Sequence, residues 1–114
     1  MQRREYAAAE NDLQRSASLE PANGEVQIAL GLLMKKTGRV SAAKNALEKA
    51  VELDPQNAYA RYHLAVVLSD DYKDRSGALQ LFYDVLQAEE KYSGLKTMAK
   101  VQIEAIRDSR LYDR

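Results

Sequence analysis

The sequence predicts an all-α protein of about six helices, and three observations carry the prediction. The 114 residues are rich in Ala, Leu, Glu and Lys and include only five Gly and two Pro, a composition that favours helix. Apolar residues recur at helical spacing in several long segments. The pattern Pro-x-Asn occurs twice, at Pro21 and at Pro55, which are 34 residues apart. A fixed period of this length indicates a repeat array whose units are helical hairpins.

Six segments fit the helical pattern, and none alternates cleanly as a half-buried strand would. The second segment ends in Lys35, Lys36 and Gly38, which favours a helix C-terminus there. Ser41 is the expected N-cap of the third segment. The predicted helices cover residues 5–19, 24–37, 41–53, 58–71, 76–89 and 93–109.

The two Pro-x-Asn patterns explain how the hairpins are separated. Proline is not tolerated inside a helix, and the residue before it is pushed out of the helical region. The asparagine two residues later, Asn23 or Asn57, can cap the helix that follows. Each pattern therefore ends one helix and starts the next.

Composition and charge exclude several classes of protein. Lys and Arg together number 17, as do Asp and Glu, so no basic field points to nucleic acid. The lack of Cys rules out disulfides, thiolate metal sites and a Cys nucleophile. No secretory signal pattern and no bilayer-length apolar run is present, so we expect no membrane insertion. We expect a soluble protein of the cytoplasm, with the periplasm as the alternative.

The spacing of small and apolar residues resembles the tetratricopeptide repeat (TPR) family. That pattern places a large apolar residue, then Leu-Gly and a further large residue, in the first helix of each repeat. The second helix carries a small Ala, an aromatic residue or Leu, another Ala, and a closing Pro. The middle repeat matches with Leu30, Gly31, Met34, Gly38, Ala43, Leu47, Ala50 and Pro55. The next repeat matches with Leu64, Ala65, Leu68, Ala78, Phe82 and Val85, and the first, in part, with Tyr6, Ala9, Leu13, Ser16 and Pro21.

This resemblance covers nearly the whole chain and implies one domain, a right-handed superhelical α-solenoid of antiparallel helix pairs. Residues 1–23 would be a partial repeat with its second helix only, and 24–57 a full repeat. Residues 58–91 would be a full repeat with one extra residue in its turn, and 92–114 a capping helix that shields it. Because the first repeat starts at its second helix, we expect a piece of a longer array or an apolar stripe covered by another molecule. That stripe comprises Ala9, Leu13 and Ala17.

The resemblance also implies where the helices approach closely. Gly31 and Ala65 would lie at contacts too tight for a larger side chain. The second helices would present small residues to them at Ala9, Ala43 and Ala78. Leu47 and Phe82 would fill the space between successive hairpins.

No motif for catalysis, a cofactor or a metal is present. His63 is the one histidine, and we favour a partly buried helix residue over a general base or metal ligand. Residues 70–75 bring carboxylates together but lack the glycine and distal Glu of a calcium loop, so a solvated turn is favoured. Residues 35–39 could bind an anion, but a charged helix end facing water is favoured. We therefore expect no enzymatic activity.

The family's first helices line a concave groove that binds an extended or helical peptide. Carried over by register, the groove positions are Glu25, Ile28, Leu32, Lys35, Lys36, Tyr59, Tyr62, Val66, Ser69 and Asp70. Of these, we expect partner contacts from Ile28, Leu32, Lys35, Lys36, Tyr59, Tyr62 and Val66. The apolar and aromatic members would form an exposed strip, which usually marks an interaction site.

Family members that bind a terminal carboxylate use Lys, Asn and Arg at set groove positions. The corresponding residues here are Ala29, Tyr59 and His63, which cannot form such a clamp. The sequence therefore predicts a non-catalytic interaction module that binds a peptide or amphipathic helix of another protein. Two alternatives stay open: a homo-oligomeric scaffold that pairs through the partial repeat or the groove, and an accessory domain of a larger protein.

Overall fold

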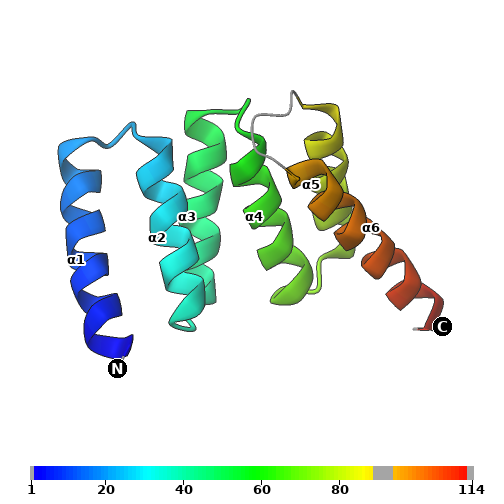
Figure 1. The fold of residues 1–114 in the computed structure, drawn as a ribbon, viewed down its shortest axis with the longest axis horizontal. Helices are drawn as coiled ribbons and strands as arrows, with labels where there is room; N and C mark the ends of the chain where they lie inside the picture. The colour runs from blue at the N-terminus through cyan, green and yellow to red at the C-terminus, as the bar shows by residue number, and fades with distance from the viewer. Residues whose placement is uncertain (1, 89–93, 113–114) are drawn as a thin grey trace. The chain divides into compact units, whose positions relative to one another are not determined.

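The computed structural model describes residues 2–88 and 94–112 of the chain, which form six α-helices and, within these ranges, no strand (Figure 1). The helices are α1 (Gln2–Leu19), α2 (Gly24–Lys36), α3 (Val40–Leu53), α4 (Ala58–Asp70), α5 (Arg75–Gln87) and α6 (Leu95–Tyr112). The prediction of an all-α fold with six helices is confirmed. The predicted helix ends at residues 89 and 93 lie outside the described residues.

The chain divides into two compact units, Met1–Pro55 (unit 1) and Gln56–Arg114 (unit 2). Unit 1 holds α1 and the antiparallel hairpin of α2 and α3 (Figure 1). Unit 2 holds the antiparallel hairpin of α4 and α5, followed by α6. None of the described helices is both long enough and apolar enough to cross a membrane.

Both predicted asparagine caps are confirmed. The side-chain oxygen of Asn23 accepts hydrogen bonds from the backbone N–H groups of Glu25 at 3.0 Å and Val26 at 3.4 Å. The side-chain oxygen of Asn57 accepts one from the N–H of Ala60 at 3.1 Å. Each cap satisfies N–H groups that the first helical turn leaves without a partner.

The α3 helix starts at a different residue from the one predicted. The α3 helix begins at Val40, and the preceding Arg39 makes no side-chain cap, so the prediction that Ser41 is the N-cap is wrong. The end of α2 determines this geometry. Gly38 adopts a φ of +83°, with its N–H on the carbonyl of Lys35, and the N–H of Arg39 donates to the carbonyl of Met34. In this Schellman arrangement Arg39 becomes the residue that immediately precedes α3.

Gly31 marks the tight contact within the hairpin of unit 1. A Cβ added at this position would lie 2.7 Å from Cγ of Leu47 and 3.3 Å from the carbonyl oxygen of Ala43. Both of those residues are completely buried. The predicted close approach of α2 and α3 at Gly31 is therefore confirmed, and its cause is direct steric exclusion.

Unit 2 is built around Phe82 of α5, which is completely buried. The ring of Tyr62 on α4 meets it edge-on, with 5.6 Å between ring centroids. The α6 helix closes this core with one face, which carries Leu95, Ala99, Ile103 and Ile106. The α6 helix therefore covers the core that α4 and α5 form.

Packing in α1 is thinner. Ala9 is exposed, Leu13 and Ala17 are half-buried, and Leu19 keeps 77% of its surface accessible. A polar contact joins α1 to the turn before α3, because the guanidinium of Arg39 donates two hydrogen bonds to the carboxylate of Glu10, one of them 2.9 Å long. This contact lowers the pKa of Glu10 below its ordinary value of 4.5, chiefly through hydrogen bonding to Arg39.

Candidate functional site

The candidate surface of unit 1 lies on α2. Leu32 and Lys35 are half-buried, whereas Lys36 is exposed at the end of the helix. Ile28 is only 5% exposed, so the expectation that it belongs to an exposed strip is wrong. The reason is that the buried face of α2 is broad and also includes Gln27, Leu30 and Gly31.

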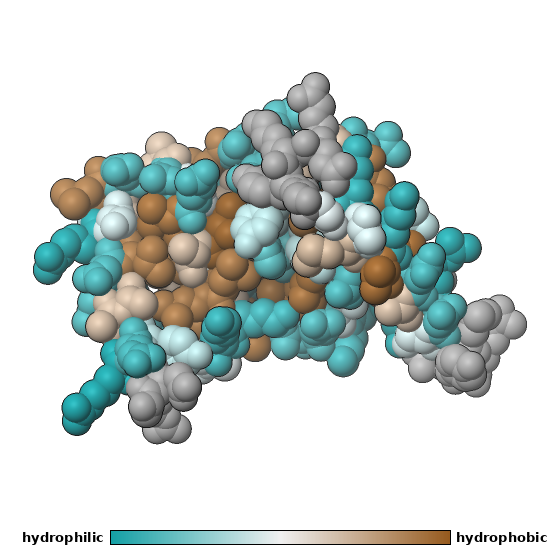
Figure 2. Space-filling view, in the orientation of Figure 1, coloured by the Kyte–Doolittle hydropathy of each residue, from teal (hydrophilic) through white to brown (hydrophobic). Residues whose placement is uncertain are grey.

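Hydrophobic side chains gather over α1 and α2 on the face of unit 1 turned to the viewer in Figure 2. Apolar residues of these two helices that keep part of their surface accessible include Leu13, Val26, Leu32 and Leu33. A contiguous apolar surface of this kind usually marks a place where another molecule binds. Leu32 is thus one of several apolar residues of unit 1 that keep part of their surface accessible, beyond the predicted groove positions.

The candidate surface of unit 2 lies on α4. Tyr59, Val66 and Ser69 are half-buried and Asp70 is exposed. Tyr62 is 6% exposed, because its ring packs against Phe82, so the prediction of exposure is wrong here as well. The apolar residues of α4 that keep part of their surface accessible therefore include Tyr59, Val66 and Leu68, whereas Tyr62 belongs to the core.

His63 is half-buried between two tyrosines, and the prediction of a partly buried helix residue is confirmed. Its ring meets that of Tyr59 edge-on at 4.4 Å and that of Tyr62 at 5.2 Å between centroids. In the described part of the chain no group of three His, Cys, Asp or Glu side chains lies close enough to hold a metal ion.

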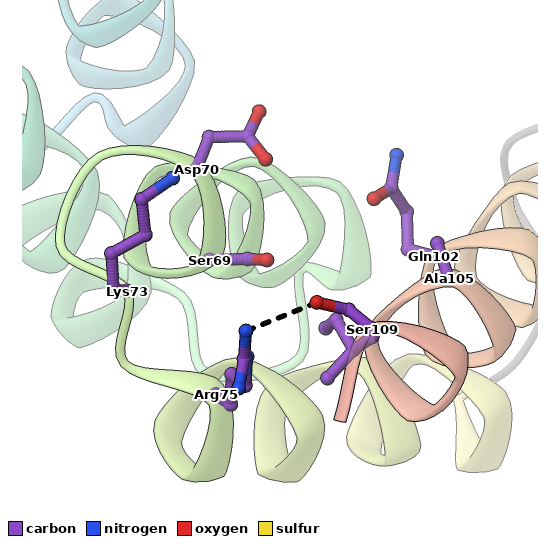
Figure 3. Close-up of a pocket in the computed structure, with 8 residues that line it drawn as sticks. Ser69, Asp70, Lys73, Arg75, Gln102, Ala105 and Ser109 are labelled. Carbon is purple, nitrogen blue, oxygen red and sulfur yellow. Dashed lines mark hydrogen bonds between the residues drawn. The ribbon is translucent and has the colours of Figure 1, made fainter. Parts of the chain in front are cut away.

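Sequence reasoning missed a polar hollow in unit 2, where the end of α4, the start of α5 and the middle of α6 meet (Figure 3). It has a volume of about 200 Å³. Its polar lining comes from Ser69, Asp70, Lys73, Arg75, Gln102 and Ser109. Across it, Nη2 of Arg75 donates a hydrogen bond to Oγ of Ser109 at 3.0 Å. The one signal in the sequence was that Gln102 and Ser109 share the helical face of Ile106.

The α6 helix also exposes apolar residues beside this hollow. Met98 is 47% exposed and Val101 is 59% exposed. With Ala105, which lines the hollow and is exposed, they follow i, i+3, i+7 spacing and share one face of the helix. The sequence analysis assigned no binding role to this face of the helix.

Comparison with known proteins places this arrangement in a family. The model of the tetratricopeptide repeat matches residues 1–65. No curated protein sequence is similar enough to count as a match. Solved structures do match the fold over most of their own length, at identities that establish similarity of fold.

The Yersinia enterocolitica type III secretion chaperone SycD, solved with a peptide of the translocator YopD, has a TM-score of 0.83 and 17% identity. The alignment covers 96% of this chain and 85% of that one. PcrH in complex with the chaperone-binding region of PopD has a TM-score of 0.82 and 19% identity, with 96% and 84% covered. A SycD structure described as an alternative dimer has a TM-score of 0.83 and 18% identity, with 96% and 84% covered. Because the family model spans more than half of the chain, the protein belongs to the tetratricopeptide repeat family.

Proposed function

We propose that this protein is a non-catalytic interaction module that binds a peptide or an amphipathic helix of a partner protein. The observation that carries the proposal is the accessible apolar surface on the first helices of the two hairpins. Leu32 on α2 and Tyr59 and Val66 on α4 are half-buried. Tyr59 and Val66 pack against the core of unit 2 with part of their surface and keep the rest accessible. When a partner covers the accessible part of these side chains, apolar surface is removed from water, which contributes favourable free energy to binding.

The charged residues beside Leu32 add specificity to this surface. Lys35 and Lys36 lie one helical turn after it, at the C-terminal end of α2. Charges at the edge of a binding surface speed the encounter with a partner of opposite charge and select among partners, more than they add affinity. A segment that presents apolar side chains to Leu32 and acidic ones to the lysines would fit this part of unit 1.

The structural neighbours support a peptide-binding role. SycD was solved with a peptide of YopD, and PcrH with the chaperone-binding region of PopD. Those proteins share the fold at low sequence identity. The surface residues of this chain therefore decide which partner it binds, and the experiment below identifies that partner.

The test compares three versions of the protein as bait in an extract of its native cell. Leu32→Glu combined with Val66→Glu places charge on both helices without touching the core residue Tyr62. Tyr83→Ser, which alters a tyrosine that is 43% exposed on α5, is the control. We expect one protein to be retained by the wild type and the control and lost with the double variant, with unchanged helical circular dichroism. Equal retention by all three baits would refute a binding role for these faces.

Self-association is the second candidate function, and α1 is the observation that favours it. Leu19 is 77% exposed and Ala9 is also exposed, so α1 keeps apolar surface that another copy could cover. Light scattering over a range of concentrations tests this directly. A mass that rises to that of a dimer in the wild type, but not in a Leu13→Glu/Leu19→Glu variant, would support it; a monomer throughout would remove it.

A further inference from the structure

We propose that the polar hollow of unit 2 is a subsite for the carboxylate side chain of an Asp or Glu in the segment that the protein binds. This inference rests on the proposed function and adds to it a position with defined chemistry. The hollow has contributions from α4, from the turn before α5, from the start of α5 and from α6 (Figure 3).

The size and lining of the hollow favour a polar occupant. Its volume of about 200 Å³ compares with a share of about 30 Å³ for one water molecule in the liquid, so it is wet when nothing is bound. The side chains of Ser69, Arg75, Gln102 and Ser109 surround this space in Figure 3. A ligand that displaces the water must replace its hydrogen bonds, which an apolar side chain cannot do.

The charges of the lining favour an anion over a cation. Among the residues that line the hollow, Lys73 and Arg75 are positively charged and Asp70 alone is negatively charged. Asp70 is exposed, so water and salt screen its charge, whereas Arg75 is half-buried and is screened less. The nearby carboxylate of Asp74 is engaged as the N-cap of α5 and accepts a hydrogen bond from the N–H of Gly77 at 2.9 Å.

Arg75 is held in place for this role. Its hydrogen bond to Ser109 fixes the guanidinium between α5 and α6. A guanidinium has five N–H donors in a planar fork that matches the two oxygens of a carboxylate, so it can serve Ser109 and a ligand together. The hydroxyl of Ser69 and the carboxamide of Gln102 provide further donors.

The hollow follows accessible apolar residues along two helices of unit 2, Val66 on α4 and Val101 on α6. Ser69 and Asp70 follow Val66 by one turn of α4, and Ala105 follows Val101 by one turn of α6. A bound segment with apolar side chains on Val66 and Val101 would bring a following residue to the hollow. The subsite is distinct from the terminal-carboxylate clamp of other family members, whose positions here are Ala29, Tyr59 and His63.

The test uses a library of short random peptides with blocked ends, so that side chains supply the only carboxylates. Peptides are selected on the wild-type protein, and their affinities are measured by fluorescence anisotropy with the acidic residue present or replaced by its amide. The protein variants are Arg75→Gln and Lys73→Asn. Asn suits position 73, where φ is +55°. The control is Lys100→Asn, which removes the same charge from an exposed site outside the hollow.

We expect the selected peptides to share apolar residues and an Asp or Glu at a fixed distance from them. Replacing that residue by its amide should weaken binding to the wild type and the control by about threefold to tenfold, the range for a partly exposed charge-assisted contact. The same replacement should have little effect on the Arg75→Gln protein. Selected peptides that lack an acidic residue, or an equal effect in all proteins, would overturn the subsite and leave the peptide-binding function intact. Selection of no peptide at all would overturn both.

Discussion

Replacing Gly31 by Ala should destabilise the protein, although the same change in most helices is stabilising. In an unhindered helix interior, Gly→Ala gains about 0.5–1 kcal/mol, because the unfolded chain loses conformational freedom. Here the new Cβ would lie 2.7 Å from Cγ and 3.1 Å from Cδ2 of Leu47, and 3.3 Å from a backbone carbonyl oxygen. Leu47 is completely buried and cannot turn away, so α2 and α3 must move apart.

The magnitude follows from two opposing terms. Overpacking a filled core costs about 1–3 kcal/mol, which exceeds the gain from helix propensity. We expect a net loss of about 1 kcal/mol in the free energy of unfolding. Urea unfolding followed by circular dichroism measures this change, provided that the slope of the transition stays the same.

Two comparisons make the reasoning refutable. Gly24→Ala is the matched control, because a Cβ there would meet only ordinary contacts, at 3.7 Å from the carbonyl oxygen of Ala50 and 3.8 Å from Cβ of Leu53. It should change stability by less than about 0.5 kcal/mol. In a Leu47→Ala background the contacts with Cγ and Cδ2 are removed and only the one with the carbonyl oxygen of Ala43 at 3.3 Å remains, so Gly31→Ala should cost clearly less than it does in the wild type. A Gly31→Ala protein at least as stable as the wild type would show that the helices do not meet as closely as the structure indicates.

Three further outcomes are expected. Ala43→Leu forces extra volume into a completely buried site and should lower stability by about 1–3 kcal/mol, measured by urea unfolding. Asn57→Ala removes the cap on the N–H of Ala60 and should cost about 1 kcal/mol, whereas Asn57→Asp, which keeps the accepting oxygen, should cost much less. Because Arg39 lowers the pKa of Glu10, the stabilisation from this pair is present above the ordinary value of 4.5 and is lost as pH falls through the lowered pKa. The stability difference between the wild type and Glu10→Gln should therefore shrink in acid, and a difference that is constant with pH would contradict the pairing.

The predictable parts of the fold depend on neighbours in the sequence. Asn23 and Asn57 cap α2 and α4 as the Pro-x-Asn pattern indicates, because a cap is a contact between residues two or three positions apart. Gly38 ends α2 for the same local reason. Ser41 was predicted on equally local grounds, but the Schellman turn starts α3 one residue earlier and leaves this serine inside the helix.

The candidate site was predictable only in part. Register placed Leu32, Tyr59 and Val66 on accessible positions, and the structure leaves all three half-buried. Periodicity gives the direction of a side chain from its helix, but not how far the neighbouring helix covers it. For this reason Ile28 and Tyr62 were expected at the surface although they are buried.

The sequence by itself determined that this chain forms helical hairpins and that Asn23 and Asn57 cap two of the helices, since these features follow from spacing and backbone chemistry. The family resemblance added that Gly31 must be small. The tertiary structure decided which polar groups meet. Glu10 and Arg39 are 29 positions apart, and Arg75 and Ser109 are 34 apart. No local pattern pairs them, because their contact depends on the packing of helices that the chain brings together only on folding.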